Sequence, residues 1–227
     1  MSKEGKNKGI LREPEEGFLE KVINWYNKQE KLINVIFVSV VVVVLALLFY
    51  FMYWAPKRQA KAEMAIYKAE QYFAADSVQL ALNGDGTCEG LLDVIKEYPC
   101  TKTADRARFM VGSCYIKDGK LDDAISMLKK CSTRSKLISV QALGLIGDAY
   151  WEKNNLGSAA KYYKKAYKKN PNDLLTPMYL LRYAMVSEAQ GNWDKAIKAY
   201  ETIQKEYTQS FEALDVEKRI EYAKTRL

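Results

Sequence analysis

The chain consists of long stretches with helical periodicity separated by short polar turns. From Lys61 onward, apolar residues recur every three or four positions, which is the spacing of an amphipathic helix. No run of alternating apolar and polar residues is long enough to predict a β-strand. Turn residues separate the helical stretches at Asn83-Gly84-Asp85-Gly86, Tyr98-Pro99, Asp118-Gly119, Asn154-Asn155, Asn170-Pro171-Asn172 and Gln190-Gly191-Asn192. The pattern predicts an all-α domain over residues 61–227.

An uninterrupted apolar segment precedes this domain. Residues 32–54 are 23 positions without a charge, enough for a helix of about 34 Å across a hydrocarbon core of about 30 Å. Aromatic residues such as Trp25 and Trp54 mark both ends. A cleaved signal peptide has a shorter apolar region and an A-x-A-like cleavage site, which this segment lacks. We therefore predict an uncleaved, single-pass transmembrane helix.

Two short segments flank the predicted transmembrane helix. Residues 1–31 form a polar tail, and residues 55–60 are interpreted as a linker to the domain. The second half of the tail, residues 17–31, is interpreted either as an amphipathic helix at the membrane interface or as a plain linker. Its apolar residues share helical spacing and are Phe18, Val22, Trp25 and Tyr26. Three basic residues near one end and four near the other leave the orientation open.

The helical stretches repeat along the chain. One copy matches the tetratricopeptide pattern W-x2-L-G-x2-Y…A-x3-F…A…P, with Leu143 in place of the Trp. Its matching residues are Leu143, Ile146, Gly147, Tyr150, Ala159, Tyr163, Ala166 and Pro171. The preceding copy has Val111, Gly112, Tyr115, Gly119, Ala124, Leu128 and Cys131, and the following copy has Leu180, Tyr183, Ala184, Gly191, Ala196, Tyr200 and Ile203. Small residues at fixed positions allow paired helices to approach closely, and the large ones fill the gaps between them.

The predicted fold is therefore an N-terminal transmembrane helix followed by a tetratricopeptide-type α-solenoid. Residues 61–81 and 88–98 are expected to form a long and a shorter helix that make a degenerate fourth pair before the three clear copies. Residues 211–226 carry many charges and are expected to form the closing helix that faces water.

The amino-acid composition excludes most catalytic mechanisms. Histidine is absent, which excludes His-based nucleophile systems and His-ligated metal sites. The Asn83–Gly86 turn lacks the order of a calcium or dinucleotide loop and is interpreted as a helix-ending turn. The four cysteines, Cys88, Cys100, Cys114 and Cys131, have no CxxC spacing and are expected to be mostly buried thiols, with Cys131 as a small buried apolar residue. We expect no enzyme activity, no cofactor, no metal and no small-molecule substrate.

The net charge is +7, and the positive excess is not confined to one tract of the chain. The densest positive stretch consists of Lys161, Lys164, Lys165, Lys168 and Lys169, on one or two adjoining faces of a helix. No aromatic residue is interleaved on that face to stack bases, so nucleic acid is not an expected partner. A solvated helix face is the expected role of these lysines.

Protein partners are expected instead, in the concave groove lined by the first helix of each pair. Inward-facing candidates include Arg106, Asp148 and Glu152, together with the predicted partner-binding residues Phe109, Ser113, Ile116, Trp151, Met178, Leu181 and Met185. Aromatic and methionine side chains make an adaptable apolar surface for a helix or an unfolded segment. The alternative interpretation is that several of these residues belong to the core or lie under the closing helix.

The layout resembles the YfgM-like tetratricopeptide family of the ancillary SecYEG translocon subunit. The resemblance rests on the anchor at 32–54 and on KAEMAIYKAEQYF (61–73), DSVQLALNGDG (76–86), GLLDVIKEYPCTKTADRARFMVG (90–112) and EYTQSFEALDVEKRIEYAK (206–224). It implies an inner-membrane protein with a cytoplasmic N-terminus and periplasmic repeats. It also implies partners among translocon subunits, periplasmic chaperones or exported proteins, with no catalytic residues.

Three functions fit these features. The first is a membrane-anchored scaffold at the secretion machinery, with chaperone-like handling of exported proteins. The alternative is a structural coordinator of cell-envelope assembly or division that binds cell-wall proteins. A cytosolic-facing adaptor fits the ambiguous charge count as well.

Overall fold

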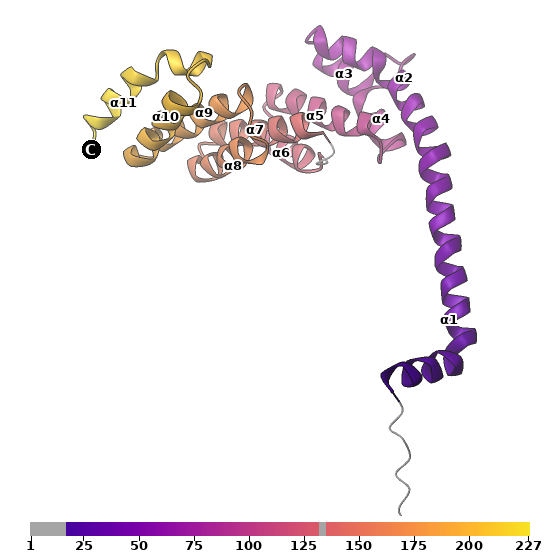
Figure 1. Cartoon of the computed structure of the whole chain (residues 1–227). Coiled ribbons are helices and arrows are strands. Elements are labelled where there is room, and N and C mark those ends of the chain that lie inside the picture. The colour runs from indigo at the N-terminus through magenta and orange to yellow at the C-terminus, as the bar shows by residue number, and fades with distance from the viewer. Residues whose placement is uncertain (1–16, 132–134) are drawn as a thin grey trace, which may run out of the picture. The chain divides into compact units, whose positions relative to one another are not determined.

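The structure, a computed structural model, describes residues 17–131 and 135–227 (Figure 1). These residues form helices and turns with no strand, so the all-α prediction is confirmed. The chain divides into two compact units, Met1–Trp54 and Ala55–Leu227. The first half of the predicted tail, residues 1–16, lies outside the described residues.

The first unit is one long helix. α1 spans Phe18–Phe49 and continues as a π-helical turn, η1, at Tyr50–Trp54. Large apolar side chains over residues 32–54 are exposed; Phe37, for example, is 67% exposed. Within the described residues, one helical stretch, Lys31–Ala74, is long and apolar enough to cross a membrane. The side chains of Phe18, Val22 and Tyr26, on which the amphipathic interpretation rests, lie outside the described set.

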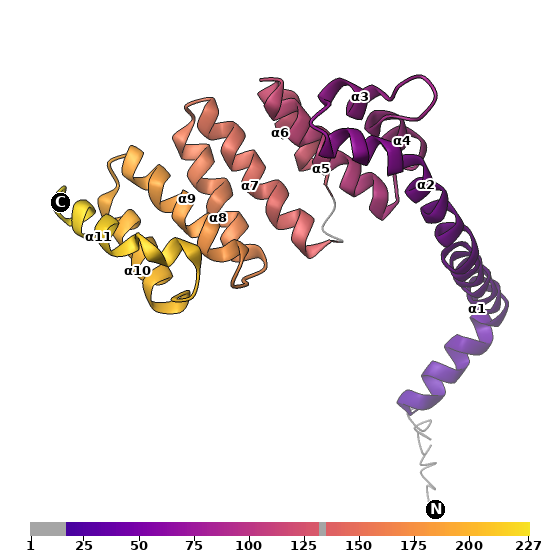
Figure 2. The same ribbon diagram turned by 90° about the horizontal axis from the view of Figure 1, so that it is seen from above.

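The second unit is a row of packed helices. Its elements are α2 (Ala55–Ala74), α3 (Val78–Asn83), α4 (Leu91–Glu97), α5 (Lys102–Lys117), α6 (Leu121–Lys129), α7 (Lys136–Glu152), α8 (Leu156–Lys169), α9 (Leu175–Ala189), α10 (Trp193–Glu206), the 3₁₀ turn η2 (Phe211–Leu214) and α11 (Val216–Lys224). The three predicted repeats are the pairs α5/α6, α7/α8 and α9/α10. Figures 1 and 2 show these pairs stacked in sequence order, with α11 after α10. The α-solenoid prediction is confirmed.

The same turn closes the first helix of each repeat. Gly119, Asn154 and Gly191 all adopt positive φ, between 55° and 71°. In each turn, the following N–H donates to the carbonyl five residues before it: Lys120 to Tyr115, Asn155 to Tyr150 and Asn192 to Ser187, each at 2.8 Å. This is the Schellman arrangement, which satisfies the last carbonyls of a helix. It redirects the chain at equivalent points of all three repeats.

Small residues set the close approach within the pairs. A Cβ atom added at Gly112 would lie 2.4 Å from Cγ of Leu128, and one at Gly147 would lie 2.6 Å from Cε1 of Tyr163. Both partners are almost fully buried. The predicted pairing of a small residue on the first helix with a large one on the second is therefore present in two successive repeats.

Several element boundaries predicted from the sequence need correction. Residues 61–81 are not one helix, because Asp76 adopts φ 58° and the Ser77 N–H bonds to the carbonyl of Tyr72, which closes α2 at Ala74. Residues 55–60, expected to be a linker, form the first turns of α2, directly after the π-helical turn η1.

Two more corrections concern the closing segment and the cysteines. The closing segment is interrupted at Asp215 between η2 and α11 and is not one helix over 211–226.

Cys131 is only half-buried, because α6 ends at Lys129 and leaves it beyond the helix. Among the four cysteines only Cys114 is buried, and Cys100 is exposed, so the expectation of mostly buried thiols is wrong.

Candidate functional site

A hollow of about 660 Å³ lies along the first helices of the three repeats. It is lined from α5 by Ile116, from α7 by Trp151, and from α9 by several residues. The α9 residues are Met178, Leu181, Arg182 and Met185. Five of the seven residues predicted from the sequence to line a partner-binding groove, Ile116, Trp151, Met178, Leu181 and Met185, therefore meet in one cavity.

The other two predicted groove residues lie differently. Phe109 is half-buried on α5 and packs against the buried cluster that contains Ile125, Leu128 and Ile146. Ser113 is half-buried one turn further along the same helix and does not line the hollow. Phe109 thus contributes to the core beside the groove, in line with the alternative interpretation made from the sequence.

Arg106, also expected to face inward, instead joins α5 to α2. Its Nη2 lies 2.6 Å from Oε2 of Glu63, and its Nε lies 2.6 Å from Oε1 of Glu70. Glu63 also accepts a hydrogen bond of 2.7 Å from Thr103. The guanidinium therefore holds the α2 side of the domain together and is not available to a groove ligand.

A polar group stands in the wall of the apolar hollow. Asp148 of α7 accepts a hydrogen bond of 2.6 Å from the Tyr163 hydroxyl and pairs with Arg182 of α9. Burial, reinforced by the negative charge of Asp148, raises the pKa of Tyr163 well above its ordinary value. The group therefore ties α7, α8 and α9 together through a neutral phenol and one ion pair.

The apolar wall combines a rigid aromatic with adaptable side chains. The Trp151 ring meets the Tyr163 ring edge-on, with centroids 6.3 Å apart. Trp151 is half-buried, so one part of its surface remains open to the hollow. Met178, Leu181 and Met185 are half-buried beside it on α9. Unbranched methionine side chains repack around different ligands, whereas a held tryptophan provides a fixed anchor.

Sequence reasoning missed three of the lining residues: Leu145, Tyr163 and Arg182. Arg182 follows Met178 and Leu181 in an i, i+3, i+4, i+7 stripe that ends at Met185, so helical spacing alone places it on the same face. Arg182 was not predicted as a lining residue, because it is charged and the expected groove was apolar. Tyr163 was assigned to core packing, but it also lines the hollow, and its hydroxyl donates a hydrogen bond to Asp148.

The described residues offer no metal centre. Within them, no group of three or more histidine, cysteine, aspartate or glutamate side chains is placed to hold an ion. Asp85, in the turn that ends α3, accepts hydrogen bonds from Tyr72, Thr87 and the Cys88 backbone. Its carboxylate therefore fixes the turn, as the helix-ending interpretation of Asn83–Gly86 requires.

Comparison with known proteins identifies the repeats. One tetratricopeptide-repeat model matches residues 134–173 and 145–211, and a second matches residues 105–136. These ranges cover the three helix pairs, so the chain contains tetratricopeptide repeats, which are modules for protein–protein interaction. Among curated proteins, none matches the sequence at a significant level.

Solved structures agree on the fold. A crystal structure of MamA protein has a TM-score of 0.53 and 20% identity, over 73% of this chain and 87% of that one. A second crystal structure of MamA has a TM-score of 0.50 and 20% identity, over 70% of this chain and 93% of that one. At this identity the likeness establishes the helical-repeat architecture.

Proposed function

We propose that this protein is a membrane-anchored scaffold whose groove along α5, α7 and α9 binds an apolar helix or an unfolded segment of a partner protein. The single observation that carries the proposal is the open cavity in which Trp151, Met178 and Met185 meet. An apolar face presented in a groove is what an amphipathic partner helix buries its own apolar face against. The ion pair of Asp148 with Arg182 adds one polar contact, which determines the position of the ligand along the groove.

The cellular setting belongs to the same proposal. The apolar segment 32–54 anchors the protein in the inner membrane, with the repeats on the periplasmic side and the N-terminus in the cytoplasm. The resemblance of the layout to the SecYEG-associated family supports partners at the secretion machinery, namely translocon subunits, periplasmic chaperones or exported proteins. An apolar, adaptable groove suits the unfolded segments of exported chains.

Co-purification of the full-length protein in mild detergent, with partners identified by mass spectrometry, tests the function. We expect translocon subunits or periplasmic chaperones with the unmodified chain and their loss with Trp151→Ala. Trp193→Ala is the matched control, because Trp193 packs on Tyr222 of α11 with centroids 6.1 Å apart and does not line the groove. Enrichment of cell-wall or division proteins would replace this setting with the envelope-coordinator alternative. Retention of every partner by Trp151→Ala would overturn the groove assignment.

Topology is tested separately. Protease added to spheroplasts should digest the repeat domain, whereas protection of the domain until the membrane is lysed would place it in the cytoplasm. Protection would exclude a periplasmic repeat domain, and it would support the cytosolic-facing adaptor.

A further inference from the structure

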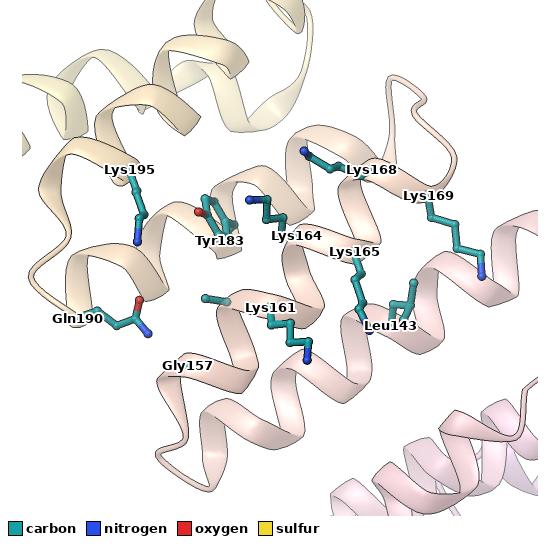
Figure 3. Close-up of a pocket in the computed structure, with 11 residues that line it drawn as sticks. Leu143, Gly157, Lys161, Lys164, Lys165, Lys168, Lys169, Tyr183, Gln190 and Lys195 are labelled. Carbon is teal, nitrogen blue, oxygen red and sulfur yellow. The ribbon is translucent and has the colours of Figure 1, made fainter.

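A second cavity, of about 890 Å³, is surrounded by lysines (Figure 3). The lysines are Lys161, Lys164, Lys165, Lys168 and Lys169 of α8 and Lys195 of α10. Leu143 of α7 and Tyr183 of α9 provide apolar surface between them, and Figure 3 shows Tyr183 between Lys164 and Lys195. This lysine cleft, formed mainly by second helices of the repeats, shares no lining residue with the groove of α5, α7 and α9.

The positive charge of the cleft has no internal counter-charge. All six lysines are exposed, and none forms an ion pair with an acidic side chain that the structure describes. The sequence contains no aspartate or glutamate between Glu152 and Asp173, so α8 has no acidic residue of its own. The field inside a hollow lined by charges of one sign attracts ions of the opposite sign.

The spacing of these lysines disfavours a purely solvated helix face. Three pairs stand at i,i+4: Lys161 with Lys165, Lys164 with Lys168, and Lys165 with Lys169. Like charges at this spacing destabilise a helix, whereas ordinary surface helices alternate sign. The helix dipole favours the two lysines of the last turn, Lys168 and Lys169, but not the earlier ones. The arrangement therefore costs stability that a bound anion would recover.

The cleft continues into two neighbouring hollows. Lys168, Tyr183 and Lys195 also line a cavity that includes Lys198 and one acidic residue, Glu206, and Lys165 and Lys169 also line one that includes Lys129. The basic surface thus extends across all three repeats, from α6 to α10. Such a continuous, hollowed track suits an extended chain that carries several negative charges.

We propose that the lysine cleft binds an acidic, Asp/Glu-rich segment of a protein partner. Lys161 and Lys169 are about 12 Å apart along the axis of α8, which is the length of about four extended residues. Leu143 and Tyr183, which lie on opposite sides of α8, offer two separate apolar contacts for side chains that stand between the acidic ones. An anionic membrane surface and a nucleic-acid backbone carry charge of the same sign, and they are the competing ligands in the test below.

This site is independent of the groove function and is tested on the full-length protein in detergent micelles. The probe is a fluorescein-labelled twelve-residue peptide of alternating aspartate and glutamate, and its matched control contains asparagine and glutamine. The cleft variant carries Lys161→Gln, Lys164→Gln, Lys168→Gln and Lys195→Gln. The control variant removes the same charge at exposed sites elsewhere: Lys102→Gln, Lys136→Gln, Lys205→Gln and Lys218→Gln.

Fluorescence anisotropy should show binding of the acidic peptide only, weakened at least about tenfold in the cleft variant and less than about twofold in the control variant. Binding should weaken with salt. The cleft variant should melt no lower than the unmodified chain, since it loses like-charge pairs, so misfolding cannot mimic the result. Trp151→Ala should leave this binding unchanged, which separates failure of this site from failure of the groove.

Three outcomes would overturn the proposal. The first is equal loss of peptide binding in the cleft and control variants, which would show a response to net charge alone. The second is binding that the cleft variant retains. The third is tighter, cleft-dependent binding of mixed micelles that contain phosphatidylglycerol, or of a thymidine oligonucleotide, which would assign the cleft to lipid or nucleic acid.

Discussion

The ring of Tyr179 in α9 lies directly against Gly144 in α7. A Cβ atom at position 144 would stand 2.1 Å from Cε1 of that ring and 2.3 Å from its hydroxyl oxygen. Tyr179 is 4% exposed and stacks on Tyr163 with centroids 6.5 Å apart, so its ring has no room to withdraw. Glycine at 144 is therefore what allows the second and third repeats to pack at this distance.

Gly144→Ala should destabilise the domain by about 1–3 kcal/mol, because the added methyl group overfills a packed contact between repeats. Gly157→Ala is the matched control. It lies at the start of α8 with only Asn155 Oδ1 at 4.0 Å from an added Cβ atom, so alanine there should be neutral or stabilising by up to about 1 kcal/mol. Urea unfolding of the full-length protein, followed by tryptophan fluorescence, compares the two. Equal midpoints would show that Tyr179 yields to the methyl group.

The repeat architecture could be predicted from sequence because it depends on local spacing. Gly112 and Gly147 recur at the position where the second helix approaches, and their partners Leu128 and Tyr163 recur with them. The contact of Gly144 with Tyr179 was not predicted, because it joins different repeats. The tetratricopeptide pattern records positions within a repeat, whereas contacts between repeats depend on how neighbouring pairs are superposed.

The groove was predicted only in part for a related reason. Helical spacing placed Trp151, Met185 and Asp148 on the inner faces, but Arg182, which completes the wall, was not among the predicted groove residues. Asp148 and Arg182 come from different repeats, and their pairing depends on the distance between α7 and α9. In the same way, the sequence placed Arg106 on an inward face but could not show that α2 covers it. The ion-pair partners of charged side chains, which lie far apart in the sequence, are the main feature that the sequence did not predict.

Buried tyrosines should make the domain sensitive to alkali. Burial raises the pKa of Tyr179 and of Tyr200 to about 12, whereas an unfolded tyrosine ionises near 10. Their stabilising effect is therefore complete below about pH 10 and is lost as pH rises toward 12. The free energy of unfolding should fall by up to about 1.4 kcal/mol per pH unit for each tyrosine in this window.

Tyr200→Phe should reduce that alkaline slope, and Tyr67→Phe, at a residue 63% exposed, should not. Urea midpoints measured between pH 9 and 12 provide the comparison. An unchanged slope in Tyr200→Phe would mean that this tyrosine is exposed or already ionised in the folded protein.

The four thiols should differ in reactivity. Burial raises the pKa of Cys114 to about 11 and that of Cys131 to about 12, and since the thiolate is the reactive form, both should react slowly in the folded protein. Cys100 is exposed and should react first with a maleimide at pH 7. Mass spectrometry of labelled peptides, with and without urea, measures the order. Labelling of Cys114 before Cys100 would contradict the burial of α5 against α2 and α4.

The link between α2 and α5 should weaken in acid. Burial alone would raise the pKa of Glu63, but hydrogen bonds from Arg106 and Thr103 outweigh it and hold that pKa below its ordinary value. A carboxylate with a lowered pKa stabilises the fold above its unfolded pKa, near 4.5. This contribution is lost as pH falls from there through the folded pKa. The α2–α5 contact should therefore loosen below about pH 4.5.

Arg106→Met keeps most of the side-chain volume and removes both ion pairs, so at pH 7 it should cost about 1 kcal/mol, the range of half-exposed pairs. It should also reduce the loss of stability between pH 5 and 3, because Glu63 then loses the partner that lowers its pKa. Lys102→Met removes a neighbouring positive charge that makes no ion pair with a described side chain, and it should change neither quantity. Urea midpoints at pH 7 and pH 3.5 measure both effects. If Arg106→Met and the unmodified chain lose equal stability in acid, then Glu63 owes its low pKa to Thr103 and Gln59 and not to the guanidinium.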